Sequence, residues 1–105
     1  MKGKLLEGEF SSRGTLRGGL LLLAPADALA LINRAADEGV PILGVDGFRI
    51  TQTTTESPLE HLADFSSAVS EGHGCWQQAE AFVRARSEHG LLFEVSLGDD
   101  PIEAV

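Results

Sequence analysis

The sequence has little sulfur and no long hydrophobic segment. Cys75 is the single cysteine among 105 residues, which excludes an internal disulfide framework and is typical of a reducing compartment. The longest apolar run, Leu20 to Ala26, is far shorter than a membrane-spanning helix, and the residues after Met1 are too mixed for a signal-peptide core. We therefore expect a cytoplasmic protein with no membrane segment.

Positive charge is also scarce. Eight Lys and Arg residues stand against sixteen Asp and Glu residues, which gives a net charge of −8 and a pI of about 4.7. Nucleic-acid phosphates and anionic lipids both require a basic surface, so this balance argues against both as partners. Residues 1–35 hold five basic and three acidic residues (+2), whereas residues 36–105 hold three and thirteen (−10). A basic protein is the partner that this charge favours, although acidity of this degree often serves solubility alone.

The length and hydrophobic content bound the organisation of the chain. A chain of 105 residues with 43% hydrophobic residues fits one domain with one core, and residues 1–105 are taken as that domain. Any function must therefore lie on one small core or at its surface.

Local patterns predict strand, strand, helix, hairpin, short helix, helix and strand, in that order. The longer helices depend on apolar residues at i, i+3, i+4 and i+7, and the last strand depends on alternation. Asp46-Gly47 has the composition of a hairpin turn. This order predicts an α/β (α+β) two-layer sandwich, a mixed sheet of about four or five strands with two or three helices packed on it. The predicted strands are 4–10, 15–23, 42–45, 48–51 and 91–97, the predicted helices are 25–38, 58–65 and 75–88, and 66–74 is a predicted loop.

The inward positions of these elements predict the core. Each falls on the apolar face of its helix or strand. The expected core residues are Leu22, Leu31, Ile32, Ile42, Phe82, Phe93 and Val95.

A reactive thiol is one candidate site. Cys75 would lie in the first turn of a helix, where the positive dipole end and a nearby imidazolium stabilise a thiolate. His73 or His61 could then serve as the base. The other interpretation is a core thiol, because Cys75 lies four residues before Ala79 on the inward face and cysteine is often buried.

A second string resembles the strand motif of α-amylase-type glycoside hydrolases. It runs from Gly44 to Thr51 and reads GVDGFRIT. In that family the residue two after the arginine is the nucleophilic aspartate, but Thr51 stands there in this chain. The eight-stranded barrel of that family also needs upwards of about 200 residues. The glycosidase interpretation is therefore rejected, and Asp46-Gly47 is interpreted as a turn.

No metal or cofactor site is expected. His61, His73, Cys75 and His89 lack the close spacing of zinc motifs. The glycines at 14, 18 and 19 do not follow a strand and open a helix, as a phosphate-binding loop requires. They are expected to mark a bulge or close packing.

A loose resemblance suggests a role in binding. It is carried by VPILGVDGF at 40–48, by Ser57-Pro58-Leu59-Glu60 with Asp64-Phe65-Ser66, and by 76–82 and 91–95. This frame resembles small acidic bacterial immunity-type proteins and hypothetical proteins of mobile gene cassettes. The resemblance implies a protein that neutralises a toxin by presenting carboxylates to its basic surface.

The sequence is compatible with two classes of function, and it also raises the question of dimerisation. The preferred hypothesis is a non-enzymatic protein-binding module of the immunity or antitoxin-like kind that binds a basic partner. The alternative is a small thiol-dependent or ligand-binding enzyme centred on Cys75, His73 and His61. A homodimer that shares a sheet face or edge is also suggested, because so small a chain has many apolar residues to cover, namely Leu20 to Leu23, Leu91, Leu92 and Phe93. The carboxylates expected to bind the partner are Asp46, Glu56, Glu60, Asp64 and Glu71.

Overall fold

The computed structural model describes residues 2–50, 55–56, 61–87 and 90–102. Its main sheet is organised around one long strand, β3, which pairs antiparallel with three others. A separate hairpin precedes it in the chain, and Leu23 after that hairpin forms an antiparallel bridge to Phe93. The strands are β1 (Thr15–Arg17), β2 (Leu20–Leu22), β3 (Ile42–Ile50), β4 (Thr55–Glu56), β5 (Leu62–Asp64) and β6 (Leu92–Leu97).

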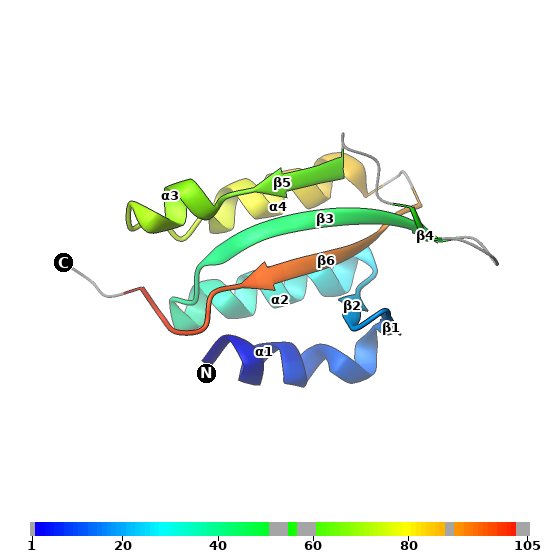
Figure 1. Cartoon of the computed structure of the whole chain (residues 1–105), viewed down its shortest axis with the longest axis horizontal. Coiled ribbons are helices and arrows are strands. Elements are labelled where there is room, and N and C mark those ends of the chain that lie inside the picture. The colour runs from blue at the N-terminus through cyan, green and yellow to red at the C-terminus, as the bar shows by residue number, and fades with distance from the viewer. Residues whose placement is uncertain (1, 51–54, 57–60, 88–89, 103–105) are drawn as a thin grey trace.

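The helices lie on one side of this sheet. Figure 1 shows α2 behind β6 and α4 behind β5, with α1 running along the β6 side. The opposite face of β3, β5 and β6 is turned toward the viewer and carries no helix over it. The helices are α1 (Lys2–Phe10), α2 (Pro25–Glu38), α3 (Ser66–Ser70) and α4 (Trp76–Arg86), and a 3₁₀ turn, η1 (Ser11–Arg13), follows α1.

The predicted α+β class, two layers and four-stranded sheet are confirmed. Every pairing among the described residues is antiparallel, where the sequence predicted a mixed sheet. In the described part of the chain, no helix has the length and apolar character that crossing a bilayer requires.

Helices α2 and α4 form where the periodicity places them. Pro25 occupies the first turn of α2, and Gly39 ends the helix in the left-handed conformation at φ 74°. The indole nitrogen of Trp76, at the start of α4, donates to the Val40 carbonyl at 2.7 Å. This bond fixes the start of α4 against the segment that leads into β3.

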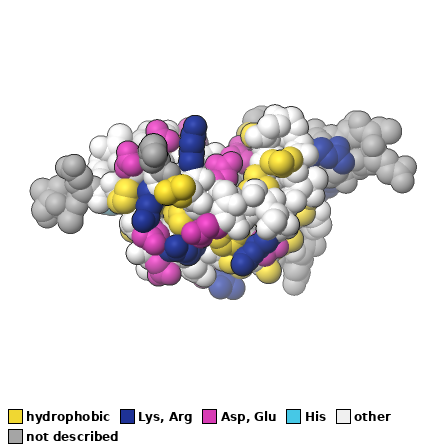
Figure 2. All heavy atoms as spheres, turned by 90° about the horizontal axis from the view of Figure 1, so that it is seen from below, with side chains coloured by type: hydrophobic (Ala, Val, Ile, Leu, Met, Phe, Trp, Pro, Cys, Tyr) yellow, Lys and Arg dark blue, Asp and Glu magenta, His cyan; other side chains and the backbone are white. Residues whose placement is uncertain are grey.

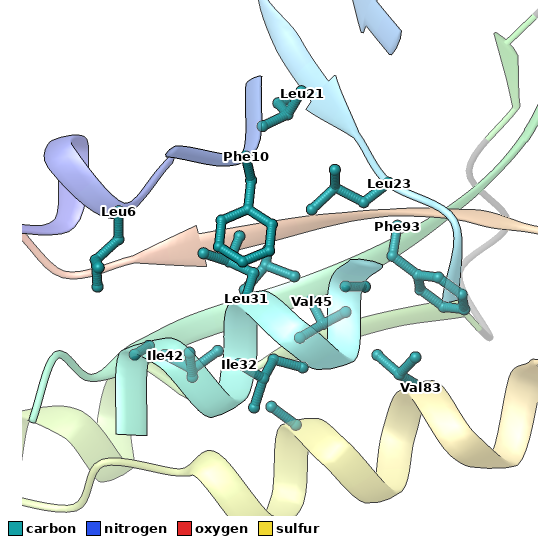
Figure 3. Packing of buried hydrophobic residues seen from close by; sticks show 14 of the residues in the cluster. Leu6, Phe10, Leu21, Leu23, Leu31, Ile32, Ile42, Val45, Val83 and Phe93 are labelled. Atoms are coloured by element: carbon teal, nitrogen blue, oxygen red, sulfur yellow. The ribbon is translucent and has the colours of Figure 1, made fainter. Parts of the chain in front are cut away.

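One hydrophobic core lies between the sheet and these helices. Figure 3 shows side chains from α1, α2, α4 and the sheet meeting there, with Phe93 on β6 among them. Phe93 is the largest of the fully buried side chains. Six of the seven predicted core residues are buried, namely Leu22, Leu31, Ile32, Ile42, Phe93 and Val95.

Phe82 differs from the prediction. It is only partly buried and packs at the margin of the core, where the Arg86 guanidinium lies 3.9 Å from its ring centre. The buried positions of α4 are Ala79 and Val83, and α4 packs against α2.

The prediction of a strand at residues 4–10 is wrong, because this segment is helix α1. Leu6 and Phe10 are four residues apart and share one buried helical face with Gly3. The Gly3 amide donates to the Asp99 carbonyl at 2.9 Å, and a side chain at Gly3 would collide with Gly98. These contacts come from a segment far along the chain and outweigh the low helix propensity of the glycines.

The predicted strand 15–23 is divided by a turn. Gly18 and Gly19 have φ values of 56° and 83°, and they reverse the chain between β1 and β2. Their role is the tight turn, and not the bulge or close packing that the sequence suggested, because a Cβ at either glycine would meet nothing within 4 Å.

The predicted hairpin turn at Asp46-Gly47 is also wrong, because β3 continues through both residues. A Cβ at Gly47 would lie 3.0 Å from Leu91 Cδ1 and 3.1 Å from His61 Cβ. A larger residue would be crowded at position 47, because neighbouring groups occupy the space that its side chain would need.

The connection between the two halves of the fold contains further differences. The predicted helix 58–65 falls partly outside the described residues, and its described end, Leu62–Asp64, is strand β5. The predicted loop 66–74 begins with the short helix α3. The Asp64 carboxylate accepts hydrogen bonds from the Ser66 amide and hydroxyl, at 2.9 and 2.6 Å, and so supports the first turn of α3.

Candidate functional site: an acidic sheet face

The helix-free face of the sheet collects carboxylates from three strands. Successive residues of a strand point to opposite faces, so Asp46 points away from the core that Val45 enters. Asp46 pairs with Glu94 on β6 and with Leu62 on β5. Gly44, two residues earlier on β3, pairs with Asp64 and with Ser96. We call Asp46, Asp64 and Glu94 the acidic face.

A shallow hollow of about 430 Å³ lies at this face. Gly44 has no side chain to fill this hollow, and a Cβ at this position would lie only 2.7 Å from the Ala63 carbonyl oxygen. Backbone is therefore exposed at Gly44, and both polar and apolar side chains surround it. Its lining residues are Leu43, Gly44, Asp46, Leu62, Ala63, Asp64, Ser66 and Ser96.

Two of the three carboxyl groups are held in surroundings that oppose their charge. Partial burial raises the pKa of Asp46, and the nearby Asp64 raises it further. Burial also raises the pKa of Glu94, and Asp46 and Glu7 add to that effect. The Ser96 hydroxyl lies 3.1 and 3.0 Å from the two Glu94 carboxylate oxygens, and donation to them lowers the pKa in part.

Asp64 has the opposite tendency. Its hydrogen bonds from the Ser66 hydroxyl and amide lower its pKa, so the charged form is favoured. The acidic face therefore combines one carboxylate whose charged form is favoured with two whose charged form is disfavoured.

Among the residues that the structure describes, no Lys or Arg is one of the groups that shift the pKa of Asp46, Asp64 or Glu94. Arg34 pairs with Glu38 and Glu9, at 2.6 and 3.2 Å, and Arg84 pairs with Glu80 at 2.9 Å. The other described ion pairs, Lys2 with Glu38 and Arg13 with Asp27, also lie away from the sheet face. A cation for the acidic face would have to come from a ligand or a partner.

The structure brings together two of the five carboxylates expected to bind a partner. Asp46 and Asp64 share the acidic face, whereas Glu71 is exposed beyond the end of α3. Glu56 pairs with Arg49 through the backbone of β4, and Glu60 lies outside the described residues. Glu94 was not predicted. Its place between Leu92 and Ser96 marked it as outward-facing, but only the β3–β6 register puts it opposite Asp46.

The thiol of Cys75 lies in a setting that disfavours a nucleophile. Cys75 is buried, and burial raises the pKa of its thiol, which keeps it protonated. Its Sγ lies 3.8 Å from the backbone carbonyl of His73, and the His73 side chain is exposed. Cys75 also adopts a left-handed conformation at φ 63° immediately before α4. This geometry favours a structural role for the thiol.

His61 and Cys75 are not brought together. The Ile42 amide donates to the Gly74 carbonyl, so Cys75 adjoins the start of β3. His61 lies beside Gly47, five residues further along that strand. At about 3.3 Å per strand residue these places are about 16 Å apart. This distance is too long for a thiol–imidazole pair.

The side chains of His61, His73 and Cys75 also belong to residue types that bind metals. Among residues 2–50, 55–56, 61–87 and 90–102, no three His, Cys, Asp or Glu side chains lie together as a metal site requires. His89, which the sequence grouped with them, falls outside these ranges. No protein-family model matches this chain, and no curated protein matches it either.

Proposed function

We propose that this protein is a non-enzymatic binding module whose acidic face receives a basic segment of a protein partner. More specifically, we propose an immunity or antitoxin-like protein that binds a basic toxin. The observation that carries the proposal is the convergence of Asp46, Asp64 and Glu94 on one sheet face, where no described Lys or Arg is among the groups that shift their pKa values.

The energetics of the acidic face support a cationic ligand. Carboxylates with raised pKa values are destabilised in their charged form, and a guanidinium or ammonium group placed between them removes that penalty. Arginine suits the site best, because its planar fork donates to two carboxylate oxygens at once. The apolar side chain of Leu62, which is 40% exposed beside the hollow, adds a surface for the aliphatic part of such a residue.

The charge of the whole chain supports the same class of partner. A net charge of −8 steers basic surfaces toward the protein and repels phosphates and anionic lipids. The acidic face is also unsuited to self-association, because a second copy would bring its own carboxylates against the first. A homodimer of this chain would need another surface.

A titration with a short oligo-arginine peptide tests the proposal directly. We expect the largest amide chemical-shift changes at Gly44, Asp46, Asp64 and Glu94, with an affinity that falls as salt is added. Equal changes at the helical carboxylates Asp37 and Glu80, or none at all, would overturn the proposal.

A pair of variants with equal charge separates the acidic face from net charge. The first carries Asp46→Asn, Asp64→Asn and Glu94→Gln, and the control carries Asp27→Asn, Asp37→Asn and Glu80→Gln on the helices. We expect the first to bind the peptide about tenfold more weakly, a difference of about 1.4 kcal/mol, and the control to lose much less. Equal losses would show that only the overall charge matters.

A further inference from the structure

The first hairpin presents an uncovered strand at the edge of the molecule. All of β1 is exposed, and Leu16 at its centre is 67% exposed, the highest value among the described large hydrophobic residues. A hairpin of two strands is only marginally stable alone, and an open strand edge is a template for pairing. This surface lies apart from the acidic face, on elements that precede α2 in the chain.

The backbone of β1 is set up for such pairing at Leu16. Gly18 and Gly19 both have positive φ, as in the two-residue turn of a type I′ hairpin. In that turn the flanking residues Arg17 and Leu20 exchange both ladder hydrogen bonds. Leu16 is the next residue along, so its N–H and C=O point to the open edge.

A hollow of about 290 Å³ lies beside the Leu16 side chain. Leu16 and its cross-strand neighbour Leu21 form the apolar part of its lining. Gly8 of α1 also lines the hollow, and the space where its side chain would stand is empty. Figure 2 shows the side of the molecule that carries α1, where exposed hydrophobic side chains lie among charges of both signs. The remaining lining residues are Lys4, Glu7 and Ser11.

We propose that a second copy of this chain docks on β1. The two β1 strands pair antiparallel about a two-fold axis at Leu16, so that the two Leu16 residues exchange two backbone hydrogen bonds. Thr15 of each copy then lies opposite Arg17 of the other. Each Leu16 side chain covers its counterpart, and the two hairpins become one four-stranded sheet. The contact is isologous, the commonest arrangement in protein dimers.

The charge distribution favours a second copy on this surface. Residues 1–35 carry a net charge of +2 and residues 36–105 carry −10, so contact through the first hairpin keeps the acidic parts of two copies apart. Strand β1 itself holds no carboxylate, and the hollow is lined by one lysine and one glutamate. Pairing through β5, another short edge strand, would instead bring the acidic faces of the two copies close together, because Asp64 lies on β5.

Sedimentation of two leucine variants tests the dimer. We expect the wild-type chain to sediment as a dimer at high concentration and to dissociate on dilution. Leu16→Lys places a charge at the edge and should weaken the dimer at least about tenfold. Leu5→Lys is the matched control, because Leu5 is also an exposed leucine, at 62%, but lies on α1 outside the proposed contact. A monomeric wild type, or a Leu16→Lys variant as dimeric as the control, would overturn the proposal.

Crosslinking tests the register independently of affinity. Strand residues that exchange both hydrogen bonds have Cα atoms about 5.5 Å apart, within the range of a disulfide. In a Cys75→Ala background, Leu16→Cys should form a covalent dimer when oxidised glutathione is added, and Leu5→Cys should not. Equal crosslinking of the two variants would refute pairing at Leu16. Neither experiment involves the acidic face. A negative result in either one would therefore overturn the dimer but not the proposed function.

Discussion

Glu94→Gln should stabilise this protein at neutral pH. The substitution keeps the size of the side chain and an oxygen that can accept from Ser96, but it removes the charge opposite Asp46. Because burial and Asp46 both raise the pKa of Glu94, the charged form opposes folding.

The expected gain follows from the strand geometry. Directly opposite residues have Cβ atoms about 4.5–5.5 Å apart, which puts the two carboxylate charges about 6 Å apart. With an effective dielectric constant of about 40 to 80 for a half-exposed pair, their repulsion is about 0.7–1.4 kcal/mol. We therefore expect the free energy of unfolding to rise by about 1 kcal/mol at low salt and by less at high salt.

The sign of the pH dependence is fixed by the direction of the pKa shift. The folded state binds the Glu94 proton more tightly than the unfolded state does, so the penalty is absent below the unfolded pKa. The penalty grows as the pH rises through the folded pKa and is then fully present. The gain from Glu94→Gln should therefore be largest at neutral pH and vanish as the pH falls below the ordinary glutamate range.

Urea unfolding of the wild type and the variant across this pH range measures the effect. We expect a higher midpoint at neutral pH with an unchanged slope. Glu80→Gln is the control, since Glu80 is paired with Arg84 and its neutralisation should not stabilise the fold. The reasoning is refuted if Glu94→Gln is neutral or destabilising at pH 7, or if its gain is independent of pH.

Two further predictions concern the core and the thiol. Phe93→Ala should lower the free energy of unfolding by about 3–5 kcal/mol, because the ring is fully buried. Phe82→Ala should lower it by only about 1–2 kcal/mol, since it removes a partly buried ring and its contact with Arg86. Equal losses in urea unfolding would contradict this order. Cys75 should react slowly with an aromatic disulfide reagent in the native protein and rapidly in urea, because burial raises its pKa. Native labelling as fast as that of the unfolded chain would restore the enzyme hypothesis.

The elements that were predicted correctly are those with one side against the core and the other toward solvent, because their apolar residues then recur at regular spacing. Helix α2 has its proline start, its glycine end and an apolar stripe between them. Strand β6 alternates because one side faces the helices and the other does not. In both cases local spacing alone carries the signal.

The errors fall where distant residues decide the local structure. Gly47 suggests a turn, but its lack of a side chain accommodates His61 and Leu91. Residues 4–10 are helical because Gly3, Leu6 and Phe10 meet a core built by later elements. The acidic face could be predicted only in part, since the pairing of Asp46 with Glu94 depends on strand order. Strand order cannot be read from spacing within one segment.

The position of β6 has a consequence for the order in which the chain folds. β6 follows every other described helix and strand in the chain, yet it lies inside the sheet, bonded to β3 on one side and bridged to Leu23 on the other. During synthesis on the ribosome, the preceding elements emerge while the place of β6 is still empty. The apolar faces of β3 and α2 stay exposed until Phe93 and Val95 pack against them, so the core is complete only after this strand has joined the sheet. Such non-local closure is slow compared with helix formation, so we expect the nascent chain to be at its most aggregation-prone immediately before β6 emerges.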